Sequence, residues 1–159
     1  MRIFLLCVFG AAGTLARYWM QGLVQQQTGG GFPYGTLLVN LAGCFFLGLA
    51  GEYALNQIAI SPDWRVGITT GFFGAYTTFS TFGWETGHMM QEGEWSKAGI
   101  YVCVSVLAGV LLVLGGMRLG DALPQPGRFT AAKAGHSAPA LGPAAFHYEV
   151  THQSPDRTR

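Results

Sequence analysis

The chain has 159 residues, of which 50% are hydrophobic and only 11% are charged, and its formal net charge is +1. Soluble domains carry about 25% charged residues, so this composition disfavours a soluble enzyme. Because the charge balance is nearly neutral and no lysine or arginine cluster is present, it also excludes a nucleic-acid-binding surface. Residues 1–119 hold ten of the seventeen charges, and residues 120–159 hold the other seven. The chain therefore divides into an apolar part and a polar tail.

Four apolar segments within residues 1–119 are long enough to cross a lipid bilayer, which takes about 20 residues of helix. In chain order they are expected at about residues 3–25, 35–51, which residues 53–55 can prolong, 66–90 and 98–117. The connections are short, and Ser61-Pro62-Asp63 has the pattern of a helix start. Trp64 and Trp95 stand where aromatic residues of the membrane interface are expected. The predicted fold is an all-α, multi-pass membrane protein with four transmembrane helices.

Residues 120–159 are rich in Pro, Ala, Gly and Ser, which predicts a disordered, solvated C-terminal tail. Metal binding by its three histidines is the alternative interpretation; they are His136, His147 and His152. The cysteines Cys7, Cys44 and Cys103 lie far apart within apolar runs. They are expected to be packing residues, not disulfide partners or zinc ligands.

Lysine and arginine near the ends of the helices give a weak orientation signal. With four spans, Arg2, Arg65 and Arg118 share one side of the membrane, and Lys97 lies on the other. If Arg128 and Lys133 of the tail contribute to the orientation signal, the Arg2 side is cytoplasmic. If they do not count, insertion in both orientations remains open.

Three polar residues interrupt the apolar segments, and each has two interpretations. Arg17 either reaches the nearer interface as an anchor or draws anions into a vestibule. Asn40 either joins two helices by a hydrogen bond or offers its amide N–H donors to an anion. Glu85 either caps a water-filled cavity or marks the approach to the interface.

The third segment contains Gly71-Phe72-Phe73-Gly74-Ala75-Tyr76-Thr77-Thr78-Phe79-Ser80-Thr81-Phe82. Glycine and β-branched threonine in succession predict a helix break near Gly74 to Thr78. The carbonyl groups freed by such a break suit a hard cation like Na⁺.

Beyond this break, Phe79 and Phe82 share a helical face, and Ser80 and Thr81 place hydroxyl donors beside them. Phenyl rings carry a positive edge, so these groups can form a site for a small anion without a fixed positive charge. The alternative is that both phenylalanines are ordinary packing residues.

The fourth segment repeats the donor-bearing spacing, because Tyr101 and Ser105 are four residues apart on one face. Small-residue repeats occur in the third segment as Gly67 to Gly71 and Gly83 to Gly87. Such repeats predict close helix contacts and a dimer.

Residues 1–119 resemble the small bacterial fluoride channels called Fluc or CrcB. The most specific stretch is Gly71 to Phe82 followed by Glu85, which is similar to the family signature GxxGGxTTFSTFxxE. Pro33-Tyr34-Gly35-Thr36-Leu37 with Asn40, Gly43, Phe45 and Gly48 is nearly as specific. Gly10, Gly13, Arg17 and Tyr18 resemble the family's first-helix element. Ala75 and Cys44 depart from the family pattern, which commonly has glycine and serine there.

The resemblance implies an antiparallel, dual-topology homodimer with two fluoride pores, which carries fluoride passively out of the cell and keeps cytoplasmic fluoride low. It implies that Phe79 and Phe82 form a phenylalanine box and that Asn40 supplies the pore amide. It implies polar pore-lining groups at Ser80, Thr81, Tyr101 and Ser105, and a position near the vestibule for Arg17. It also implies that backbone carbonyls of Gly74 and Thr77 from both subunits hold a central structural Na⁺.

Two other functions fit four short spans. A small multidrug-type proton-coupled transporter needs a membrane carboxylate that exchanges protons for a cationic drug, yet the first segment has no acid and Glu85 lies near the end of its segment. A non-transporting assembly subunit would use Asn40 and the two phenylalanines for packing alone.

Overall fold

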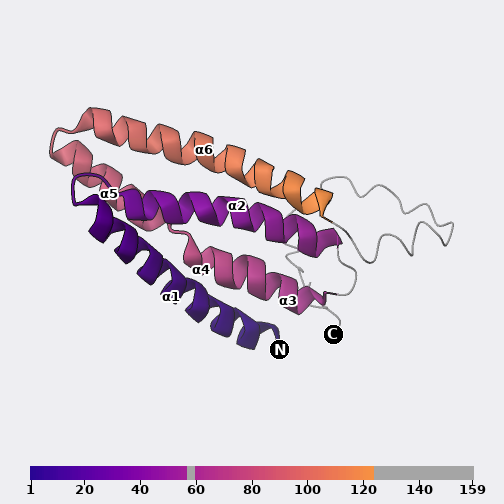
Figure 1. Ribbon diagram of the computed structural model, residues 1–159. Helices are drawn as coiled ribbons and strands as arrows, with labels where there is room; N and C mark the ends of the chain where they lie inside the picture. The colour runs from indigo at the N-terminus through magenta and orange to yellow at the C-terminus, as the bar shows by residue number, and fades with distance from the viewer. Residues whose placement is uncertain (57–59, 124–159) are drawn as a thin grey trace, which may run out of the picture.

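The structure is a computed structural model that describes residues 1–56 and 60–123, with only the backbone described at 54–56. Three helices are long and continuous: α1 (Arg2–Thr28), α2 (Tyr34–Asn56) and α6 (Trp95–Ala122). The third segment consists of shorter pieces: α3 (Pro62–Val66), η1 (Gly67–Phe73), α4 (Gly74–Tyr76) and α5 (Phe79–Gln91). Figure 1 shows these four segments side by side, with α2 between α6 and the α3–α4 part of the third segment, whereas α5 contacts α6 directly.

The four expected helical segments are all present, and α1, α2 and α6 are long and apolar enough to cross a membrane. Each extends several residues beyond the predicted limits, because polar residues at the ends continue the helix. Ser61 is the N-cap of α3 with Pro62 in its first turn, as predicted. Helix α6 continues to Ala122, past the expected boundary at residue 119. The predicted tail, with His136, His147 and His152, lies almost entirely outside the described residues.

The third segment changes its helical form twice. Residues Gly67–Phe73 form a π-helix, which the sequence did not predict. The predicted break falls at Thr77 and Thr78, where the backbone is extended (φ −79°, ψ 156° and φ −146°, ψ 113°). Gly74 itself is helical, so the chain leaves the helix near the end of the expected interval. The bent third helix is therefore confirmed, with the extended residues lying between α4 and α5.

Helices α2 and α6 make the most extensive contact in the described chain, and glycine allows their backbones to approach closely. A Cβ added at Gly48 would overlap the carbonyl of Val113, and one added at Gly116 would overlap that of Phe45. Small residues allow this kind of contact between transmembrane helices. The approach fixes α2, and with it Asn40, relative to α6.

The two predicted small-residue repeats have different surroundings. A Cβ at Gly67 or Gly71 would contact Phe9 of α1 at 3.0–3.1 Å, so this repeat makes a close helix contact within the chain. Around Gly83 and Gly87, no atom of the described residues other than the neighbouring helix backbone lies within 4 Å of an added Cβ. The second repeat is thus open in the single chain.

Arg2 and the start of α3 lie at the same end of the molecule. The Arg2 Nε donates to the Asp63 Oδ1 at 3.0 Å, which brings Arg65 to this end as well. In Figure 1 the C-terminal end of α6, which carries Arg118, is also at this end. Lys97 lies at the start of α6, at the other end. The expected sharing of one side by the three arginines agrees with this arrangement.

The close contact between α2 and α6 can be tested with a pair of alanine substitutions. Gly116→Ala should destabilise the protein by about 1–3 kcal/mol, because its methyl group would overlap the backbone at Phe45. Gly115→Ala is the matched control, since no atom lies within 4 Å of a Cβ there. Thermal unfolding of the purified variants in detergent measures the difference. Equal stability of the two variants would contradict this packing.

Candidate functional site

The side chain of Asn40 bridges α2 to the break in the third segment. Its Nδ2 donates to the Thr78 carbonyl at 3.0 Å, and its Oδ1 accepts from the Thr78 N–H at 2.7 Å. Both backbone groups of Thr78 are therefore satisfied by one amide, which is what an extended residue inside a membrane requires. Of the two sequence interpretations of Asn40, the joining of helices is present in this geometry. One N–H of Nδ2 remains for another partner.

The bonds at the break also release two carbonyl groups. In an unbroken helix the Gly74 carbonyl would accept from the Thr78 N–H, and the Thr77 carbonyl from the Thr81 N–H. The first donor instead bonds to Asn40, and the second bonds to the Thr78 Oγ1 at 3.3 Å. Both carbonyls thereby lose their helical donors.

Three hydroxyl groups cluster at the first turn of α5. The Thr78 side chain caps the helix, donates to the Thr81 Oγ1 at 2.9 Å, and lies 3.3 Å from the Ser80 Oγ. The N-terminus of a helix carries unpaired N–H groups and a partial positive charge, which favours anions. Ser80 and Thr81 therefore stand at the electropositive start of α5, as neighbours of the cavity and not as part of its wall.

A cavity of about 270 Å³ lies between α2, α5 and α6 beside the break. It brings together residues that the sequence analysis selected from three different segments. The residues that line it are Asn40, Cys44, Leu47, Thr77, Thr78, Phe79, Phe82, Ser105 and Val106. The cavity thus combines amide, hydroxyl and thiol groups with two phenyl rings and contains no charged side chain.

The phenyl rings of Phe79 and Phe82 form one wall of this cavity. Their centroids are 5.6 Å apart and the ring planes are inclined by 43°. Phe82 also packs on the ring of Tyr101 at 5.0 Å, whereas Phe79 is 84% exposed in the single chain. The ring of Phe82 is therefore packed within the chain, whereas most of the Phe79 side chain is exposed on its surface.

Ser105 and Arg17 each carry a buried polar atom without a hydrogen bond in the described part of the chain: the Oγ of Ser105 and the Nε of Arg17. Ser105 lines the cavity around Asn40. Arg17 lines neither of the two cavities described here and lies one turn before Gln21 on α1. Ser105 therefore lines the same cavity as Asn40, and Arg17 does not.

Tyr101 is part of a polar network that crosses the helix bundle. Gln21 donates to Thr36 at 3.0 Å, and Thr36 donates to Glu85 at 2.7 Å. The Tyr101 hydroxyl donates to the other oxygen of Glu85 at 2.8 Å, and Tyr101 is fully buried. Although Tyr101 shares a face of α6 with Ser105, its hydroxyl is thus bonded to Glu85 and does not line the cavity around Asn40.

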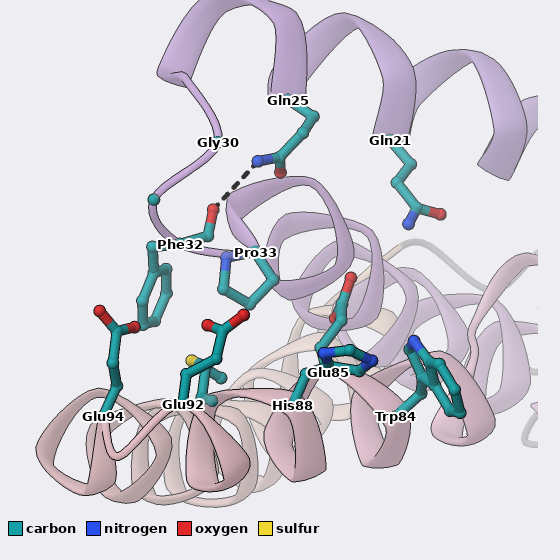
Figure 2. Close-up of a pocket in the computed structure, with 12 residues that line it drawn as sticks. Gln21, Gln25, Gly30, Phe32, Pro33, Trp84, Glu85, His88, Glu92 and Glu94 are labelled. Atoms are coloured by element: carbon teal, nitrogen blue, oxygen red, sulfur yellow. Dashed lines mark hydrogen bonds between the residues drawn. The ribbon is translucent and has the colours of Figure 1, made fainter.

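Glu85 also lines a second cavity, of about 400 Å³, at the end of the molecule where α1 turns into α2. Figure 2 shows Gln21 and Gln25 of α1 on one side, with Glu85 and His88 of α5 and Glu92, which follows α5, on the other. Gln25 closes this end by donating to the Phe32 carbonyl at 3.1 Å. This geometry places Glu85 at the inner end of a polar recess.

Sequence reasoning selected Asn40 and Thr77 but gave Thr78 no role of its own. The pair of adjacent threonines at the break was the available signal, since threonine is a frequent N-cap. The bond between Thr36 and Glu85 was also missed, because it joins residues 49 positions apart.

A sequence model of the family described as CrcB-like protein, Camphor Resistance (CrcB), matches residues 4–117. The chain belongs to the CrcB family. It is 47% identical over 100 residues to the fluoride-specific ion channel FluC of Geotalea daltonii, covering 63% of this chain and 81% of that protein. It is 43% identical over 119 residues to the protein of the same name from Nitratidesulfovibrio vulgaris, covering 75% and 96% of the two chains. With its membrane-length helices, this CrcB protein is a multi-pass membrane protein.

The polar network of this CrcB protein can be tested at Thr36, which is almost fully buried. Thr36→Val replaces the hydroxyl group with a methyl group and so keeps the side-chain volume nearly constant. Glu85 loses a hydrogen-bond donor, and Gln21 loses a hydrogen-bond acceptor. We expect a loss of about 1–3 kcal/mol of stability, because buried polar groups would lose their partners. Thermal unfolding in detergent measures it against Thr14→Val, an exposed threonine of α1. A Thr36→Val variant as stable as this control would contradict the network.

Proposed function

We propose that this protein is a fluoride-selective ion channel that mediates passive fluoride efflux across the cell (inner) membrane and keeps cytoplasmic fluoride low. The relatives named above are fluoride-specific ion channels. The observation in this chain that supports the same function is the uncharged cavity beside the helix break, lined by Asn40, Ser105 and the two phenylalanines. This places the protein among ion channels and not among enzymes.

The chemistry of the cavity suits a small, strongly hydrated anion. Removing such an ion from water is expensive unless many donors replace its hydration shell. The free Nδ2–H of Asn40, the Ser105 hydroxyl and the start of α5 supply donors, and the phenyl edges of Phe79 and Phe82 supply positive partial charge. Because none of these groups carries a full charge, the anion is not held too tightly to leave.

We infer that the functional unit is an antiparallel, dual-topology homodimer that contains two pores. Phe79 is 84% exposed although it lines the cavity, so a second copy would complete the wall around it. The open surface at Gly83 and Gly87 gives the same helix room for a close neighbour. The weak bias of basic residues between the two ends agrees with insertion in both orientations.

The structural Na⁺ expected at the dimer centre fits the residues at the break. The Gly74 and Thr77 carbonyls lack their helical donors, and beyond the local helix backbone no described atom lies within 4 Å of a Cβ added at Gly74. Na⁺ bound there would neutralise the partial negative charge of these carbonyls. Two carbonyls from each subunit would together offer the oxygen ligands that a hard cation prefers.

The remaining assignments follow from this dimer. We propose that residues 1–119 form the channel domain, with α6 continuing three residues beyond it, and that 120–159 form a separate tail. Ser80 and Thr81 would contact the anion near the start of α5, with Tyr101 holding Glu85 behind them. Arg17 would draw anions toward the vestibule.

Fluoride flux separates this function from its two rivals. Purified protein in liposomes should release fluoride, pass chloride far more slowly, and need no proton gradient, as measured with ion-selective electrodes. A small multidrug-type transporter would instead couple proton flux to a cationic drug, and an assembly subunit would pass no ion. Either of those results would reject the channel.

The phenylalanine wall is tested by replacing each ring with an aliphatic side chain. Phe79→Ile and Phe82→Ile should each reduce fluoride efflux by about tenfold or more, because isoleucine has no positive edge. Size-exclusion chromatography should show that assembly is retained. Phe4→Ile, at an exposed position on α1 away from the cavity, is the control. Unchanged flux in both test variants would refute the assignment.

A further inference from the structure

Cys44 is a polar wall residue of the cavity between α2, α5 and α6, and the proposed function gives it no role. It follows Asn40 by four residues on α2, so the two side chains lie one turn apart on the same helical face. Its sulfur is directed at α6, because a Cβ added at Gly109 would lie 3.5 Å from the Cys44 Sγ. Cys44 is a free thiol, and no other cysteine lines this cavity.

The opposite wall at this level carries an unpartnered polar group. Ser105, one turn before Gly109 on α6, has an Oγ with less than 1 Å² of accessible surface and no hydrogen bond in the described part of the chain. Buried hydroxyl groups without protein partners are rare, and they indicate water or a ligand. Cys44 and Ser105 are thus two polar residues, from α2 and α6, that line the same cavity.

We propose that Cys44 is a pore-lining residue and that its thiol is a binding site for a thiophilic cation such as Ag⁺, which blocks the channel. The inference rests on the proposed function for the block, but not for the binding. In this step the S–H bond breaks, an S–Ag bond forms, and the proton passes to water. The bound metal lies one helical turn from Asn40 and fills space that a conducted anion would need.

The other two cysteines serve as internal controls. Cys7 lies on α1 and Cys103 on α6, and both are exposed on the surface of the single chain. Neither lines the cavity. A metal bound to either of them would leave the space beside Asn40 open.

The experiment measures fluoride efflux from liposomes that contain the full chain, in chloride-free buffer, with and without silver nitrate. The ratio of the two rates is the readout for each variant. Wild-type protein and Cys7→Ser/Cys103→Ser should lose flux by about tenfold or more, because a narrow pathway cannot bypass a bound ion. Excess dithiothreitol should restore it. In Cys44→Ser the ratio should stay near one.

Equal block of Cys44→Ser and wild-type protein would overturn the inference, as would wild-type flux that Ag⁺ leaves unchanged. Intact-mass spectrometry tests the site without flux. Cys7→Ser/Cys103→Ser should bind one more Ag⁺ per chain than a variant with all three cysteines replaced by serine, and equal binding would reject the site. If untreated wild-type liposomes release no fluoride, the proposed function fails while the mass measurement still decides on Cys44.

Discussion

The site depends on the two hydrogen bonds between the Asn40 side chain and the backbone of Thr78. Hydrocarbon does not tolerate unpaired backbone groups, so a helix can break within a membrane only where other groups satisfy them. One amide does so here, with an oxygen that accepts from the Thr78 N–H and a nitrogen that donates to its carbonyl. The extended backbone then starts a new helix, α5, whose electropositive end lies beside the cavity. The same bonds leave the Gly74 and Thr77 carbonyls without helical donors.

The rest of the fold holds these partners in place. Glycine contacts bring α2 against α6, and this positions Asn40 opposite Ser105. Glu85 accepts from Thr36 of α2 and from Tyr101 of α6, so that α5 is tied to both helices beyond the break. A carboxylate held by two neutral donors serves as an anchor, and the cavity around Asn40 remains uncharged. In the proposed channel, this arrangement keeps the carboxyl group of Glu85 away from the cavity that we assign to the anion.

Much of this arrangement can be predicted from the sequence, because hydropathy and glycine-threonine patterns are local signals. They predict the four segments and the break, and polar and aromatic spacing marks Asn40, Phe79, Phe82 and Ser105 as candidates, which only the resemblance to CrcB channels assigns to a pore. Features that depend on how two segments align could not be predicted in this way. The bond between Thr36 and Glu85, the direction of the Tyr101 hydroxyl and the packing of Gly71 against α1 all belong to this class. The π-helix was missed because no local pattern distinguishes its residues from an α-helix.

The central claim is that the neutral amide of Asn40 has two functions. It forms hydrogen bonds with the Thr78 backbone at the break, and it donates a hydrogen bond to the anion. Fluoride efflux from liposomes containing Asn40→Asp tests it most directly. Aspartate keeps the acceptor for the Thr78 N–H, but it has no N–H donor and adds a negative charge. The account predicts fluoride release no faster than from protein-free liposomes, with assembly retained. Release at the wild-type rate would contradict it.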